Sequence, residues 1–180
     1  MKTANKAIYT LTFLIITLFI SCGNSDDTED SQIEPLFSAQ VDNENQPYES
    51  KTAKAILTKH TAGVPYTLYV EGKENYRLRN IKFTILSNTE PEPGVFIIKL
   101  YNNVRAVYFE DYGIPPQKFW VAPDDDGTDP DLKYGTINLT ELTKNRAKGT
   151  FNFNAVEDRG DTIRTVTNGV FDVPLTRQGF

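Results

Sequence analysis

The sequence predicts an all-β domain: an antiparallel β-sandwich or partly open barrel of about eight to ten strands. Two observations lead to this fold class. Short runs of β-branched and aromatic residues recur from residue 36 onward, and clusters of Gly, Pro, Asn and Asp separate them. Moreover, no window of about a dozen residues shows a helical hydrophobic period with capping residues.

Nine runs have the composition and length of strands. They are Leu36–Val41, Thr52–Lys59, Tyr66–Glu71, Ile81–Leu86, Val95–Tyr101, Ala106–Tyr112, Thr136–Leu142, Lys148–Ala155 and Thr162–Leu175. The cleanest alternation places Phe151 and Phe153 on one face and Asn152 on the other, so both phenylalanines are expected in the core. Val95–Tyr101 is apolar on both faces and is expected to be a central, covered strand.

The dipeptide Asn168-Gly169 interrupts the last run. Asn-Gly is a strong signal for a two-residue hairpin, but it also suits a bulge within one long strand. The sequence leaves both readings open and favours the bulge, because the residues on either side continue the strand composition.

The first residues have the pattern of an export signal. Lys2 and Lys6 precede an uncharged apolar run of the length of a signal-peptide core, which is short for a membrane-spanning helix. Residues 1–21 are therefore predicted to be a signal peptide. The segment Leu18-Phe19-Ile20-Ser21-Cys22 resembles the bacterial lipobox, although Phe19 stands where leucine is usual. This resemblance implies that Cys22 carries the lipid.

Residues 22–35 are predicted to be an acidic, flexible tether, because they offer too little apolar surface to offset the entropy of ordering. Within it, Ser25, Asp26, Asp27 and Glu29 resemble the surface-export signal of lipoproteins from Bacteroidota. That resemblance implies the outer face of the outer membrane. The alternative is a solvated spacer that carries no address.

The remaining chain, residues 36–180, is long enough for one domain with a single core. Because Cys22 is the only cysteine, no disulfide can form within the chain. Loss of the signal removes two lysines and no acid, so the formal charge changes from −5 to −7. An acidic domain without a basic cluster is unsuited to nucleic acid. The lipid is the expected link to the membrane.

The C-terminal half carries a resemblance to a known family. Gly149-Thr150-Phe151-Asn152-Phe153 and Thr167-Asn168-Gly169-Val170-Phe171-Asp172-Val173 resemble a family of small lipoproteins of Bacteroidota that is known only as a domain of unknown function. The resemblance extends over about residues 36–175. It implies a β fold in an envelope lipoprotein, and it supplies no catalytic residues.

Three segments are candidates for binding or modification. Clustered carboxylates at Asp124, Asp126, Asp129 and Asp131 offer oxygen ligands for Ca²⁺, but the spacing does not match an EF-hand, and a solvated acidic loop is the alternative. Beside them, Tyr112, Phe119 and Trp120 have the composition of a sugar-binding surface, or else of core and loop anchors. Asp161-Thr162-Ile163 resembles an O-glycosylation motif of Bacteroidota, which implies Thr162 as acceptor.

No nucleophile and base converge in the sequence: His60 is the only histidine, and no Gly-x-Ser-x-Gly elbow is present. The expected function is a non-enzymatic binding or accessory module with no cofactor other than a possible Ca²⁺, contacting a glycan or an envelope protein. One alternative is a structural or interaction subunit of an envelope assembly. Another is a glycan-acting hydrolase that uses a carboxylate pair such as Glu110 and Asp111.

Overall fold

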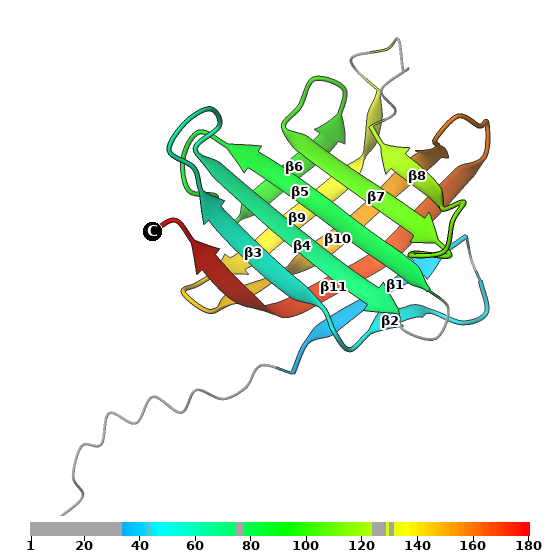
Figure 1. The fold of residues 1–180 in the computed structure, drawn as a ribbon, viewed down its shortest axis with the longest axis horizontal. Helices are drawn as coiled ribbons and strands as arrows, with labels where there is room; N and C mark the ends of the chain where they lie inside the picture. The colour runs from blue at the N-terminus through cyan, green and yellow to red at the C-terminus, as the bar shows by residue number, and fades with distance from the viewer. Residues whose placement is uncertain (1–33, 43, 75–77, 124–128, 130–131) are drawn as a thin grey trace, which may run out of the picture. The chain divides into compact units, whose positions relative to one another are not determined.

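The described part of the chain forms one mixed sheet of eleven strands that folds into two layers (Figure 1). A computed structural model describes residues 34–42, 44–74, 78–123, 129 and 132–180. The strands, in chain order, are β1 (Leu36–Val41), β2 (Tyr48–Ser50), β3 (Lys54–Lys59), β4 (Tyr66–Glu74), β5 (Arg79–Ser87), β6 (Gly94–Lys99), β7 (Val104–Glu110), β8 (Lys118–Ala122), β9 (Lys133–Leu142), β10 (Arg146–Glu157) and β11 (Ile163–Gln178).

Strands β3, β4, β5, β7 and β8 form one layer, and β1, β11, β10, β9 and β6 cross behind it (Figure 1). Two pairings join the layers. On one side β3 pairs with the end of β11, which is a parallel pairing in an otherwise antiparallel sheet. On the other side β8 pairs with β10 over only two residue pairs. The predicted all-β sandwich or partly open barrel is thus confirmed, and its one parallel pairing was not foreseen.

Nine of the strands correspond to the nine predicted runs, and β2 and β8 are additional. Both additional strands are short. Strand β2 pairs only with β1, and β8 lies among prolines that mask its strand character in the sequence. The core between the layers is apolar, as the alternation predicts. Phe151 and Phe153 are both buried there, whereas Asn152 between them is exposed.

The interruption at Asn168-Gly169 is a bulge within one long strand, as the sequence favoured. Strand β11 has one extra residue here relative to both β10 and β1. In β10, for example, Phe151 and Phe153 face Gly169 and Val166. Asn168 has a φ of +52°, a left-handed conformation that asparagine tolerates. Gly169 leaves room for Phe151, because a Cβ there would lie 2.5 Å from the ring.

The prediction that Val95–Tyr101 forms a central strand is wrong. Strand β6 is an edge strand that pairs only with β9, and Val95 is 65% exposed. Ile98 is buried in the core, while Val95 on the opposite face is uncovered. An apolar run shows that a strand could be covered on both faces, but the presence of a second covering layer depends on the tertiary arrangement.

Candidate functional site

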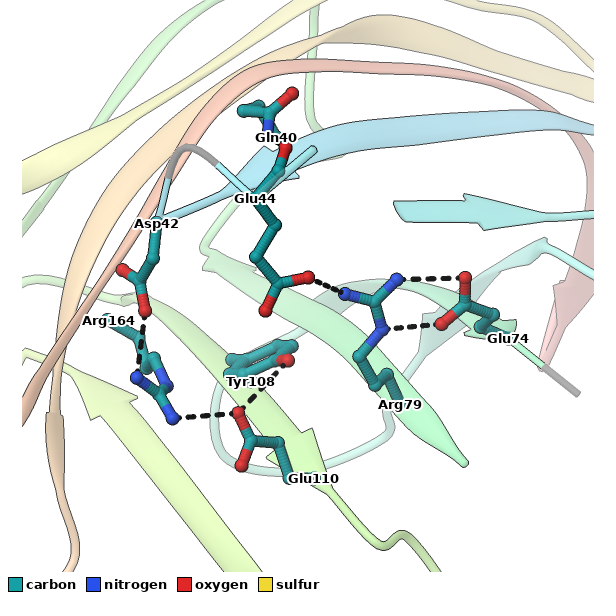
Figure 2. A network of polar contacts seen from close by, with 8 residues as sticks. All are labelled: Gln40, Asp42, Glu44, Glu74, Arg79, Tyr108, Glu110 and Arg164. Atoms are coloured by element: carbon teal, nitrogen blue, oxygen red, sulfur yellow. Dashed lines mark hydrogen bonds and ion pairs between the residues drawn. The ribbon is translucent and has the colours of Figure 1, made fainter. Parts of the chain in front are cut away.

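A cluster of charged side chains lies where β1, β4 and β7 end and β5 and β11 begin (Figure 2). Because neighbouring strands are antiparallel, the end of one strand lies beside the start of the next, and residues far apart in sequence meet here. The cluster contains four carboxylates, two guanidinium groups and one phenol, from Asp42, Glu44, Glu74, Arg79, Tyr108, Glu110 and Arg164. We call it the end network.

Arg79 is the buried centre of one half of the end network, with a side chain only 6% exposed. Its Nε and Nη2 donate to both carboxylate oxygens of Glu74, at 2.5 and 2.9 Å, and its Nη1 donates to Glu44 at 2.8 Å. The ring of Tyr48 lies against the guanidinium, 5.5 Å away. Burial by itself lowers the pKa of Arg79, but the hydrogen bonds and charge of Glu74 outweigh it and raise the pKa above its ordinary value. Arg79 therefore stays charged.

Arg164 is the centre of the other half. Its Nη1 donates to Asp42 and its Nη2 contacts Glu110, each at 2.9 Å. Asp42 also accepts the backbone N–H of Thr165 at 2.7 Å, and Glu110 accepts the hydroxyl of Tyr108 at 3.4 Å. Burial raises the pKa of Tyr108 above its ordinary value, so this hydroxyl remains a hydrogen-bond donor.

The chemistry of the end network is that of a structural clamp. Each guanidinium is held between two carboxylates, and the pKa values of Arg79, Tyr108 and Arg164 are all raised further above neutral pH. A general acid or base needs a pKa near the working pH. Glu110, half of the carboxylate pair considered for a hydrolase, is bound by Arg164 and Tyr108. This arrangement ties the ends of β1, β4 and β7 to the starts of β5 and β11.

Trp120 does not form the exposed aromatic platform that a sugar-binding surface requires. It is 2% exposed and belongs to the core. Its indole N–H donates to Oγ1 of Thr162 at 3.0 Å. The interpretation of Trp120 as a ligand contact therefore fails, because the ring packs between the layers. The alternative reading of the sequence, a core aromatic, describes it.

Tyr112 and Phe119 lie on the outer face of the sheet and are half-buried. Both rings contact Phe109, with centroids 5.3 and 5.6 Å from its own. Two ammonium groups cover this small cluster: Lys73 lies 5.0 Å from the ring of Tyr112, and Lys82 lies 4.6 Å from that of Phe109. The two predicted ligand contacts thus pack on the same ring, Phe109, and ammonium groups lie over Tyr112 and Phe109.

Thr162, the predicted glycosylation acceptor, is exposed just before β11. Its hydroxyl accepts from Trp120 and donates to the carboxylate of Glu157. A glycan on Oγ1 would replace the proton that it donates to Glu157. Thr162 is therefore accessible, but its glycosylation would break the hydrogen bond to Glu157.

The other predicted site residues lie mostly outside the described residues: Cys22, Ser25, Asp26, Asp27, Glu29, Asp124, Asp126 and Asp131. Asp129 is described and exposed. Among the described residues, no group of three His, Cys, Asp or Glu side chains could hold a metal ion. The calcium hypothesis stays a prediction from the sequence.

A pocket of about 320 Å³ lies toward the other end of β5, away from the end network. The side chains that line it are Thr84, Leu86, Leu100, Tyr101, Asn102, Asn103, Arg105 and Pro123. Sequence reasoning missed it, because Asn102 and Asn103 read only as a turn between two strands. The only signal in the sequence was Tyr101 beside that turn. A tyrosine at the end of a strand does not by itself indicate that its ring is exposed.

No helix in the described part of the chain is both long enough and apolar enough to cross a membrane. No curated protein and no solved structure matches the chain significantly. One family model does match, over residues 34–174, which includes nearly all of the eleven-stranded sheet. The chain therefore belongs to the family described as a domain of unknown function, DUF6252.

Proposed function

We propose that this protein is a lipid-anchored, non-enzymatic binding or accessory module on the surface of a bacterial outer membrane. The sequence supports the anchoring: a charged start, an apolar run and a cysteine preceded by Ser21 are the features of a lipoprotein signal. The acidic residues after Cys22 support export to the cell surface. The membrane, reached through the lipid, is then one partner, and a glycan or an envelope protein is the other.

The binding role is inferred from the end network, in which the charged side chains are paired with one another. A cluster of ionisable side chains is a natural place to look for catalysis. Here Arg79 and Arg164 each bridge two carboxylates, which is the arrangement of a rigid scaffold. The pocket beside Tyr101 lies elsewhere, and the described part of its lining includes one charged residue, Arg105. Because the charged network and the pocket are separate, a domain that binds a ligand is favoured over an enzyme.

The predicted tether leads directly into β1. Strand β1 begins at Leu36, directly after the predicted tether, and ends beside Asp42 of the end network. Six residues of strand span roughly 20 Å. The predicted tether therefore joins the domain at the start of β1, and the end network lies at the end of this strand.

Membrane fractionation tests the anchoring. The variant Cys22→Ser should be released in soluble form or remain with its signal uncleaved, because no sulfur is available for acylation. The matched variant Ser25→Ala, three residues away, should remain in the detergent-extractable membrane fraction at its mature size. A Cys22→Ser protein that fractionates like the Ser25→Ala protein would show that the anchor lies elsewhere.

One observation favours the second candidate function, an interaction subunit of an envelope assembly. Edge strand β6 exposes Val95, and an uncovered apolar edge is a template for pairing with another chain. Replacing Val95 with lysine should separate such an assembly without unfolding the domain. Size-exclusion chromatography of the wild-type protein and of Val95→Lys from detergent extracts measures this, and identical elution of the two proteins would count against the assembly.

A further inference from the structure

Tyr101 stands at the pocket in a conformation that packing does not explain. Its φ is +60°, in the left-handed region that bulky residues rarely adopt. Its side chain is 89% exposed, so burial of the ring does not compensate for the backbone strain. Strained residues of this kind concentrate at ligand sites, where the surrounding structure imposes the conformation.

The loop that carries Tyr101 is fixed by three hydrogen bonds. The backbone N–H of Asn102 donates to the carbonyl of Lys99 at 3.2 Å, and its side-chain amide donates to the carbonyl of Ile97 at 3.0 Å. The carbonyl of Asn103 accepts the N–H of Leu86 at 2.7 Å. The ring is therefore carried by a loop that connects β6 with β7 and is hydrogen-bonded to Leu86 of β5, so less conformational entropy remains to be lost on binding.

The lining combines apolar surface with groups that donate and accept hydrogen bonds. Leu86, Leu100 and Pro123 contribute the apolar part, and Thr84 and Asn103 contribute a hydroxyl and an amide. A sugar ring has matching chemistry, with C–H faces that stack on an aromatic ring and hydroxyls that pair with amides. The pocket volume of about 320 Å³ is at the lower end of the range for small-molecule sites.

Charge favours a neutral sugar over an acidic one. Without the predicted signal the chain has a formal charge of −7, which repels polyanions, and among the described residues of the lining Arg105 is the only charged one. We propose that the Tyr101 pocket is a binding site for a neutral carbohydrate, with the tyrosine ring as its stacking platform. The proposal rests on the proposed function of a binding module and names its ligand class and its site.

Affinity electrophoresis of the full chain in detergent tests the proposal, with four neutral polysaccharides in the gel as probes: a mannan, a galactan, a xylan and a β-glucan. At least one should retard the wild-type protein. Tyr101→Ala should weaken that retardation at least tenfold, whereas Tyr101→Phe, which keeps the ring, should retain most of it. Ile114→Ala removes an exposed apolar side chain from another loop and should bind like the wild type.

Tyr101→Gly separates a ligand-binding role from a structural one. Glycine adopts a φ of +60° readily, so the melting temperature should stay the same or rise while retardation is lost. A lowered melting temperature would show that the tyrosine is structural. Absence of retardation by all four probes, or equal retardation of the wild type and Tyr101→Ala, would overturn the carbohydrate site. None of these outcomes alters the fractionation of Cys22→Ser, so the anchoring stands or falls separately.

Discussion

The guanidinium of Arg164 lies over the indole ring of Trp120, with its Cζ 4.7 Å from the ring centroid. The same guanidinium binds Asp42 after β1 and Glu110 at the end of β7. Trp120 in turn reaches Thr162, two residues before Arg164 in the chain. This pair thus links the core to the charged surface where strands of both layers end, and it accounts for the burial of the only tryptophan.

Replacing Arg164 with lysine should destabilise the domain although the charge is kept. A compact ammonium group lacks the spread N–H donors with which Arg164 binds two carboxylates while lying over the indole ring. Lost hydrogen bonds to charged groups and lost stacking suggest a decrease of about 1–3 kcal/mol in the free energy of unfolding. Denaturant unfolding followed by tryptophan fluorescence measures it. Arg159→Lys, at a highly exposed position, is the control and should change the midpoint little.

Phe153→Ala should destabilise the domain far more than Asn152→Ala. Phe153 is buried between the layers, so its truncation leaves a cavity and should cost about 3–5 kcal/mol. Asn152 is exposed and donates only to Thr136 on the neighbouring strand, at 3.0 Å. Its loss should cost less than about 1 kcal/mol. Denaturant midpoints of the two variants give the comparison, and a larger decrease for Asn152→Ala would contradict the assigned faces of β10.

Substitutions at the two bulge residues of β11, Asn168 and Gly169, should differ strongly in their effect on stability. Gly169→Ala places a Cβ 2.5 Å from both the ring and the carbonyl oxygen of Phe151, so it should lower the melting temperature strongly. Asn168→Gly should be nearly neutral, because glycine accepts the same φ of +52°. Asn168→Val should be destabilising by about 1–2 kcal/mol, since a β-branched residue resists the left-handed region. Equal stability of Gly169→Ala and Asn168→Gly would show that the close approach of Phe151 is not required.

Part of the stability should depend on pH through Asp172. Two hydrogen bonds from Arg146, each of 2.6 Å, lower the pKa of the Asp172 carboxyl below its ordinary value. A carboxyl whose pKa is lower in the folded state stabilises the fold above its unfolded pKa of about 3.9 and loses that contribution as the pH falls. The stability difference between wild type and Asp172→Asn should therefore be constant above about pH 5 and shrink toward pH 3. Thermal unfolding across this range measures the difference, and a gap that widens on acidification would reverse the assigned sign.

The acidic residues of the tether should direct the protein to the cell surface. Replacing Asp26, Asp27 and Glu29 with alanine should leave the lipid in place but retain the protein on the periplasmic face. Protease treatment of intact cells, followed by immunoblotting, detects the difference. As a control, alanine at Glu34, beyond the proposed signal, should leave the protein accessible to protease. Equal digestion of the triple variant and the wild type would mean that the tether is only a spacer.

The sequence determined the local features of the fold because they depend on neighbouring residues. The alternation around Phe151 placed that ring in the core, and the composition around Asn168-Gly169 pointed to a bulge. A strand with one apolar face must turn that face inward, whatever its partners are. The all-β class follows from the same local information repeated along the chain.

The tertiary structure alone decided which surfaces are covered and which side chains meet. Val95 has the composition of a covered strand and lies exposed, and Trp120 has the composition of a binding platform and lies buried. Arg164 and Asp42 are 122 residues apart, and nothing local in either segment specifies the other. The edge position of β6 and the pocket beside Tyr101 likewise depend on strand order. Strand order results from the packing of all the apolar faces together, and no short segment of the sequence contains that information.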